Sequence, residues 1–168
     1  MIIAAWSAAQ SVALGVGIAA AVVALLGVWI NGLREERRRR RDLYASALEA
    51  TYAYREFAYV VRRRRTDVPG EERVRISEAL REIQRDLSKY EALMRIERCT
   101  DVAVNFKHLV EKTREVAGGY MRAAWNDDGA AEDKQMNIAD IDFTPLEKYE
   151  ETYLTAVQCD LPAWKFWR

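Results

Sequence analysis

Hydrophobic residues are distributed along this chain in two different ways. From Met1 to Leu33 no side chain is charged, and the nineteen residues Val12–Ile30 form an unbroken run of apolar residues, alanine and glycine. Beyond that run, apolar residues recur at intervals of three and four, which is typical of amphipathic helices. The pattern predicts an all-α protein in which one N-terminal transmembrane helix (1–33) is followed by an antiparallel cytoplasmic helical bundle of about four helices (34–168).

The apolar run has the length that a membrane requires. As a helix it spans ~28 Å, close to the ~30 Å thickness of the hydrocarbon layer. Trp6 and Trp29 flank it and suit the two interfaces of a bilayer. Two alternatives are weaker. A signal peptide has a positive region ahead of its apolar stretch, which is missing here, and a buried core helix is usually shorter and less uniformly apolar.

Arginines follow the apolar run directly and predict its orientation. Six of the eight residues from position 34 to 41 are arginine. Because positive residues are retained on the cytoplasmic side, we expect a cell-membrane protein with its N-terminus outside and its bundle in the cytoplasm. We also expect contact with anionic lipid headgroups. The residues concerned are Arg34, Arg37, Arg38, Arg39, Arg40 and Arg41.

Small residues within the apolar run recur at helical spacing. Three residues separate Gly15 from Ala19 and Ala20 from Ala24, and Gly17 is a further small residue of the same segment. Such spacing allows two membrane helices to approach closely, which predicts a homo-oligomer. The alternative is chance, because an alanine-rich segment produces these spacings readily.

The remaining pattern predicts four helices. The first covers 33–65, hinged from the apolar run at Asn31–Gly32, and ends in a turn at 66–70. The next two, about 71–98 and 101–125, carry apolar residues at alternating intervals of four and three. These residues are Ile76, Leu80, Ile83, Leu87, Tyr90 and Met94 in one helix, and Val102, Phe106, Leu109, Thr113, Val116 and Tyr120 in the other. The two series are out of phase, which predicts a break near Cys99, with Thr100 as the N-cap.

A last helix is predicted after a polar, acidic loop at 126–143. Thr144, Pro145 and Glu147 form a capping-box pattern with proline at the first helical position. Short connections make successive helices antiparallel, so this helix returns towards the bilayer. Its aromatic and basic tail suits the membrane interface; packing of the tail against the bundle is an equal alternative. The tail residues are Trp164, Lys165, Phe166, Trp167 and Arg168.

A formal net charge of zero conceals a strong asymmetry. Residues 34–65 contain eleven arginines and five acids, whereas 126–160 contain ten acids and two lysines. A second arginine cluster, Arg62, Arg63, Arg64 and Arg65, lies ~36 Å along the helix from the first, beyond the reach of the bilayer charge at a screening length of ~8 Å. The acidic segment of the same chain or of a neighbouring one is expected to balance this cluster, and the alternative is an unidentified anionic partner, such as a protein. Nucleic acid is not favoured, because the domain as a whole is not basic.

Catalytic and metal-binding patterns are missing from the sequence. His108 is the one histidine, and Cys99 and Cys159 do not form a metal-type pair. Gly118-Gly119 does not follow a strand and lacks the Lys-Ser/Thr of a phosphate loop. The acids around Asp140 lack the spacing of a calcium loop. The sequence therefore predicts a protein without a cofactor and without enzymatic activity.

The order of these features resembles a group of uncharacterised single-pass membrane proteins of high-GC bacteria. The resemblance rests on the uncharged span, the arginine-rich exit, the sequences YREFAYVVRRR and ERVRISEALREIQ, and the Trp/Arg-rich tail. It implies the same layout but no activity. We expect a membrane-anchored helical module for protein–protein interaction or scaffolding. The alternative is a membrane effector whose transmembrane helix oligomerises to perturb the bilayer on a cytoplasmic signal.

Overall fold

The computed structural model describes residues 2–127 and 141–161 for the backbone and 21–127 and 141–161 for the side chains, and this part of the chain consists of helices joined by turns, without strands. Four helices occur in this part of the chain: α1 (Ile2–Arg62), α2 (Pro69–Ile96), α3 (Thr100–Asn126) and α4 (Thr144–Asp160). The prediction of an all-α helical bundle is confirmed.

Helix α1 is much longer than the other three. It runs for 61 residues without interruption, so the predicted hinge at Asn31–Gly32 is wrong. One glycine in a helix costs only ~1 kcal/mol relative to alanine, and the good helix formers on both sides outweigh that cost. The apolar N-terminal run and the first helix of the bundle are therefore a single element.

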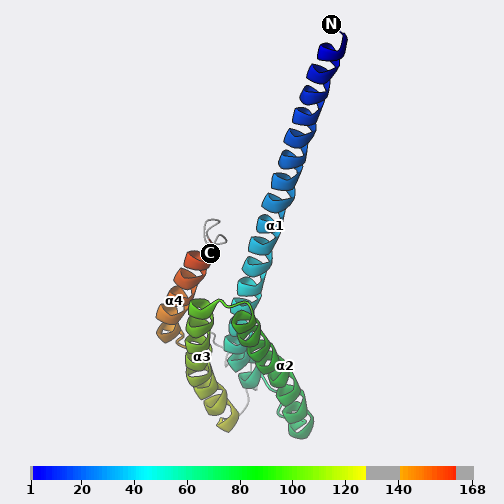
Figure 1. Ribbon diagram of the computed structural model, residues 1–168. Coiled ribbons are helices and arrows are strands. Elements are labelled where there is room, and N and C mark those ends of the chain that lie inside the picture. Colours follow the sequence, from blue (N-terminus) through cyan, green and yellow to red (C-terminus); the bar gives the residue numbers. More distant parts are fainter. Residues whose placement is uncertain (1, 128–140, 162–168) are drawn as a thin grey trace.

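Each helix runs opposite to the one before it, and α1 projects far beyond the other three (Figure 1). Helices α1 and α3 consequently run in the same direction and pack against each other at the centre of the bundle, with α4 on α3 and α2 on α1. The α2–α3 turn and the last residues of α4 lie at the end of the bundle from which α1 projects. We call this the proximal end and the opposite one the distal end.

The buried face of α1 contains a regular series that the sequence reasoning missed. Six buried residues are spaced at intervals of 3, 4, 3, 4 and 3, namely Tyr44, Ala47, Thr51, Tyr54, Ala58 and Val61. Three of them are alanine or threonine, so the series has little hydrophobic contrast in the sequence. Small residues at these positions allow the α1 and α3 backbones to approach closely. On α3 the predicted series is buried through its first four members, while Val116 and Tyr120 are half-buried.

The predicted break at Cys99 is confirmed, and its geometry is a Schellman motif. The backbone N–H of Cys99 donates to Met94 O at 3.0 Å, and that of Arg98 donates to Arg95 O at 3.2 Å. Cys99 and Met94 are both buried, which is the apolar contact that accompanies this motif. The N-cap of α3 is Cys99, without a side-chain cap bond, so the prediction of Thr100 as N-cap is wrong. The chain turns within three residues because Arg98 adopts a left-handed conformation with φ 57°.

Helix α4 begins at Thr144, as predicted, but not through the capping box. Its N-cap is Phe143, which makes no side-chain cap bond, and the backbone N–H of Thr144 donates to Asp142 Oδ1 at 2.9 Å. The hydrogen bonds with Thr144 hold the pKa of Asp142 below its ordinary value. The ring of Phe143 packs edge-on against Tyr59 and Tyr120, with centroid distances of 6.3 and 6.1 Å. Aromatic packing thus sets the entry of α4 where the sequence suggested a capping hydroxyl.

Gly118 and Gly119 lie within α3, which continues past them, and neither has a positive φ. A Cβ at Gly119 would meet nothing within 4 Å, and one at Gly118 would lie 3.7 Å from Tyr54 Oη, an ordinary contact. We expect Gly119→Ala to stabilise the bundle by ~0.5–1 kcal/mol, because alanine loses less backbone entropy on entering a helix. Urea unfolding of the full chain measures this change, and an unchanged or lower midpoint would contradict it.

Candidate functional site

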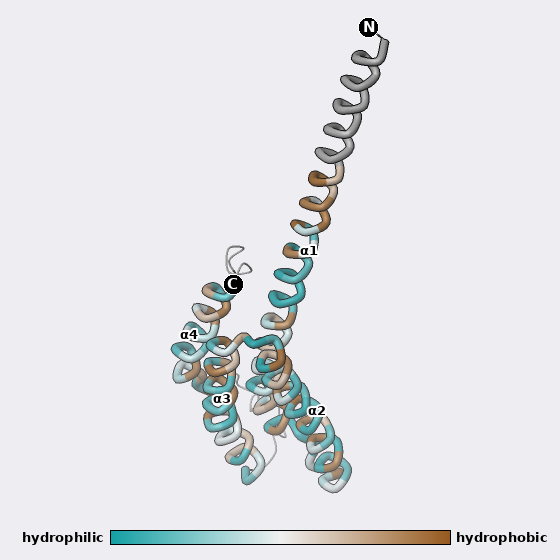
Figure 2. The backbone as a smooth tube through the Cα atoms, in the orientation of Figure 1, coloured by the Kyte–Doolittle hydropathy of each residue, from teal (hydrophilic) through white to brown (hydrophobic). Residues whose placement is uncertain are grey.

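The projecting part of α1 exposes apolar side chains to its surroundings. Every residue from 21 to 32 is exposed, and Val23, Leu25 and Val28 retain 70%, 69% and 72% of their accessible surface. Figure 2 shows this stretch as hydrophobic on successive turns, directly before the hydrophilic arginine region. A soluble helix normally hides one apolar stripe against its own domain, whereas this stretch lies outside the bundle.

Within the side chains that the structure describes, no helix contains a stretch long and apolar enough to cross a membrane. The predicted span, 12–30, begins outside those side chains. Three members of the predicted helix–helix contact, Gly15, Gly17 and Ala20, lie outside them as well, and Ala24 is exposed.

The arginine run begins one turn after the apolar stretch, and part of it turns inward. Arg39 Nη2 lies 2.9 Å from Glu97 Oε2, an ion pair between α1 and the end of α2. Arg40 Nε lies 2.9 Å from Glu36 Oε1. The hydrogen bond from Arg40 lowers the pKa of Glu36, with a smaller contribution from Arg39 and against the effect of burial. Arg34, Arg37, Arg38 and Arg41 are exposed, and Arg39 is exposed as well despite its ion pair with Glu97. Two of the six predicted headgroup arginines therefore also take part in the packing of the bundle.

A polar cluster joins three segments at the proximal end. Tyr44 donates its hydroxyl to Asp160 Oδ2 at 2.6 Å, and Arg40 Nη1 lies 3.4 Å from the same oxygen. The buried thiol of Cys99 lies 3.7 Å from Arg40 Nη1. Tyr153 adds a hydrogen bond from its hydroxyl to Tyr44 O at 2.9 Å. The cluster holds the end of α4 and the α2–α3 turn against α1.

The electrostatics of this cluster are those of a structural contact between helices, and do not favour a reactive site. Burial raises the pKa of the Cys99 thiol, against the opposing effect of the Tyr44 hydrogen bond, so the nucleophilic thiolate is disfavoured. Burial, together with the hydrogen bond to Asp160, raises the pKa of Tyr44 above its ordinary range. Both groups therefore remain protonated at neutral pH. Sequence reasoning missed the cluster because it is built from three segments that are more than fifty residues apart in the chain.

The raised pKa of Tyr44 predicts a loss of stability in alkali. The folded state holds the phenolic proton more tightly than the unfolded chain, so this contribution is complete below the ordinary tyrosine pKa of ~10 and is lost as pH rises above it. Tyr44→Phe should cost ~1 kcal/mol at neutral pH and should reduce the further loss between pH 8 and pH 10.5. Urea unfolding at both pH values provides the measurement. An equal alkaline loss in wild type and variant would contradict this assignment.

A second polar contact joins α1 to the start of α4. The hydroxyl of Tyr52 donates to Glu150 Oε1, and Arg55 Nη1 lies 3.9 Å from Glu150 Oε2. The Arg55 guanidinium also lies over the rings of Tyr52 and Phe143, at 4.8 and 5.2 Å from their centroids. Burial and the bond to Glu150 raise the pKa of Tyr52 to about 12. Two acids of α4, Asp160 and Glu150, thus pair with Arg40 and Arg55. Residues 128–140 of the acidic segment lie outside the described residues, so its predicted pairing with the cluster at 62–65 stays a prediction.

The second arginine cluster, Arg62–Arg65, lies at the distal end. Arg64 caps the C-terminal end of α3. Its Nη1 donates to Ala124 O at 2.5 Å, and its Nη2 donates to the carbonyl oxygens of Trp125 and Asp127. Its guanidinium also lies 5.2 Å from the centroid of the Trp125 ring. Arg65 pairs with Asp67 at 2.7 Å. The side chain of Arg63 is exposed on the outer surface, beside the ring of Tyr59. The predicted role of the cluster in partner binding remains a prediction, and Arg64 has a structural task that the sequence did not reveal.

Tail residues 163–168 lie outside the described residues. The contacts of Asp160 with Arg40 and Tyr44 nevertheless place the end of α4 at the proximal end, which is the direction that the alternation of helices predicted.

The described residues show little that resembles a catalytic centre. They contain no group of three His, Cys, Asp or Glu side chains able to hold a metal ion. His108 is exposed on α3. A groove of about 290 Å³ lies between α1 and the end of α2, lined by residues that include Arg39, Leu43, Leu93 and Glu97. Two of its polar side chains, Arg39 and Glu97, already pair with each other.

Comparison of the chain with protein-family models, curated protein sequences and solved structures returned no match. The resemblance to single-pass proteins of high-GC bacteria therefore stays a prediction, and the proposals below rest on the residues of this chain.

Proposed function

We propose that this protein is a membrane-anchored helical module for protein–protein interaction or scaffolding. The N-terminal run, 12–30, lies in the bilayer with the N-terminus outside, and the bundle is held in the cytoplasm. The observation that carries this proposal is the exposure of apolar side chains from 21 to 30 on the part of α1 that projects from the bundle. Lipid would remove this surface from water at ~25 cal/mol for each Å² buried.

The arginines support the same arrangement. They begin at Arg34, four residues beyond the apolar run, and thus ~6 Å further along the helix, where headgroups lie. A single helix, α1, joins the run to the core of the bundle, so the anchor and the bundle cannot turn independently. A bundle held in this way presents fixed outer faces to a partner, and exposed, charged side chains cover those faces of α2, α3 and α4.

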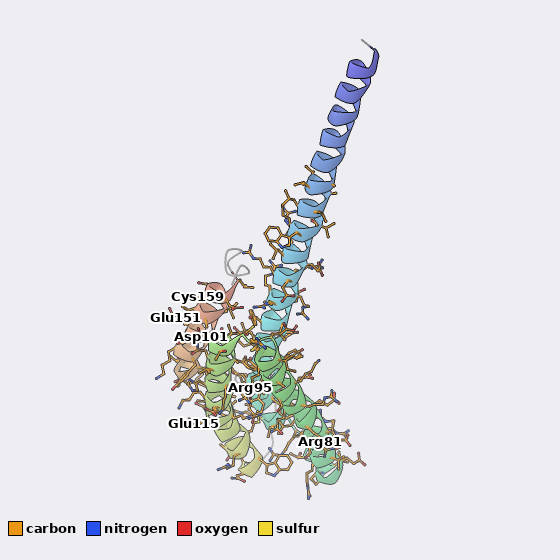
Figure 3. All side chains as sticks on the ribbon, in the orientation of Figure 1. Arg81, Arg95, Asp101, Glu115, Glu151 and Cys159 are labelled. Carbon is orange, nitrogen blue, oxygen red and sulfur yellow. The ribbon has the colours of Figure 1, made fainter. Side chains whose placement is uncertain are left out.

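The interaction role can be tested by photo-crosslinking of the full chain in its own membranes. Arg81, Glu115 and Glu151 are exposed on three different helices and serve as probe positions (Figure 3), with Arg63 as the position in the predicted partner-binding cluster. We expect a discrete adduct of constant mass from one face and none from the opposite one. The absence of a discrete adduct from all four positions would overturn the interaction role.

The continuity of α1 also favours the alternative, a membrane effector. A change in the packing of the apolar runs would pass directly into the bundle, because no flexible segment separates them. In that case Gly15→Leu and Gly17→Leu should abolish both the toxicity of overexpression and the oligomer detected by crosslinking. Unchanged toxicity and unchanged oligomer size would exclude the effector while leaving the anchored module intact.

A further inference from the structure

The α2–α3 turn carries an exposed apolar residue between exposed arginines. We call Arg95, Ile96 and Arg98 the hairpin tip. Ile96 retains 72% of its accessible surface, more than any other large hydrophobic residue in the described part of the bundle, and the side chain of Arg95 retains 63%. The tip lies at the proximal end, because the neighbouring Glu97 pairs with Arg39 of α1 at 2.9 Å (Figure 1).

The backbone at the tip provides an independent reason to assign it a role. Arg98 adopts φ 57°, and no other non-glycine residue in the described chain has a positive φ. Glycine is the usual residue at this position of a Schellman motif, and a side chain there costs ~1 kcal/mol or more. A strained backbone at an exposed arginine motivates the hypothesis that its side chain has a role. No acidic side chain lies within 4.0 Å of Arg98 among the described residues, so an internal ion pair does not explain it.

We propose that the hairpin tip is a second membrane contact, which binds anionic lipid headgroups through Arg95 and Arg98 while Ile96 enters the interface. This inference rests on the proposed function, since the anchor brings the tip to the bilayer. Of the acids nearby, Glu97 pairs with Arg39 and Asp160 with Arg40, whereas Asp101 in the first turn of α3 is exposed and reduces the net positive charge of this end. Glu91 pairs with Arg95 at 2.7 Å and is the group with which the headgroups compete.

The reach of the anchor sets the geometry of this contact. Arg39, level with the tip, lies ~14 Å along the helix from Ile30, whereas the headgroup layer is only ~5–7 Å thick. With α1 upright the tip would lie ~7 Å or more from the headgroups. Packed helices lie ~10 Å apart. A tilt of ~35°, within the range of membrane helices, reduces the ~14 Å separation to ~11 Å and brings the tip ~6 Å closer still, which places it among the headgroups. The bundle therefore leans towards the α2–α3 side on anionic membranes.

Helix α2 offers a matched control for this proposal. Val74 is also a β-branched aliphatic residue, is 57% exposed, and lies near the other end of the same helix, ~33 Å from Ile96. A nitroxide is attached to Ile96→Cys or Val74→Cys of the full chain in a Cys159→Ser background, since Cys99 is buried. The protein is reconstituted into vesicles with or without phosphatidylglycerol, and collision with a nickel-chelating headgroup lipid is measured.

We expect the nitroxide at position 96 to collide frequently with the nickel-chelating lipid in anionic vesicles and rarely in neutral vesicles. The nitroxide at position 74 should collide rarely in both. Arg95→Gln with Arg98→Gln should weaken docking about thirtyfold, whereas Arg73→Gln with Arg81→Gln, on the same helix, should not. The nitroxides at positions 96 and 74 could instead collide with the nickel-chelating lipid equally often. If the protein also stays with the vesicles in alkaline carbonate, that result would overturn the second contact and leave the anchor intact. Release of the protein by carbonate would instead overturn the anchor.

Discussion

Two aspartates in the apolar stretch of α1, Val22→Asp with Leu26→Asp, are expected to release the protein from the membrane. Both side chains are 49% exposed; Val22 lies next to the centre of the run 12–30, and Leu26 lies one turn further along the same face. Each charge costs ~2.5–3.5 kcal/mol at the middle of a membrane helix, and the pair together shifts the partition by about ten-thousandfold. Extraction of membranes with alkaline carbonate measures the released fraction.

The control for this release places the same charges on the bundle. Val74→Asp with Val104→Asp alters two residues that are 57% and 48% exposed, and this variant should stay in the membrane. Degradation in the cell would hide the result, so both variants are also synthesised in a cell-free system with vesicles. Retention of the Val22/Leu26 variant in washed vesicles would contradict the anchor.

Truncation of the central aromatic residue of α3 should give the largest loss of stability. Phe106 is fully buried, and its ring lies 5.6 Å from that of Tyr153 on α4. Phe106→Ala removes this contact and leaves a cavity, at an expected cost of ~3–5 kcal/mol, which is a large part of the stability of a domain of this size. Urea unfolding of the full chain in detergent gives the value.

Val104→Ala is the matched control, since Val104 lies two residues away on the same helix and is 48% exposed. Its cost should stay within ~0.5 kcal/mol. Similar losses in the two variants would mean that the core does not lie between α1, α3 and α4 as described.

The periodicity of the sequence predicted the helices well where apolar residues contrast with polar ones. The series on α2 and α3, and the break at Cys99, follow directly from that contrast. Prediction failed on α1, where Ala47, Thr51 and Ala58 form half of the buried series and alanine also occupies the exposed positions 45 and 53. It failed at Asn31–Gly32 as well, because one weak helix former does not stop a long helix.

The proximal cluster could not be predicted for a different reason. Arg40, Cys99 and Asp160 come together only through the packing of three helices, and no local spacing connects them. The alternation of short-looped helices predicted which end α4 would reach, but not which side chains would meet there. Likewise, Arg64 stood out in the sequence as one of a charged quartet, and only the position of the α3 carbonyl groups reveals that it caps a helix.

The side of the membrane on which the bundle lies is the most direct test of the account. Cys159 is exposed and Cys99 is buried, so a membrane-impermeant maleimide should react with Cys159. The Cys159→Ser variant is the control that should not be labelled. A cytoplasmic bundle on a membrane anchor predicts no labelling in intact spheroplasts, labelling after permeabilisation, and a labelled protein that remains in carbonate-washed membranes. Labelling in intact spheroplasts, or recovery of the full chain in the soluble fraction, would contradict it.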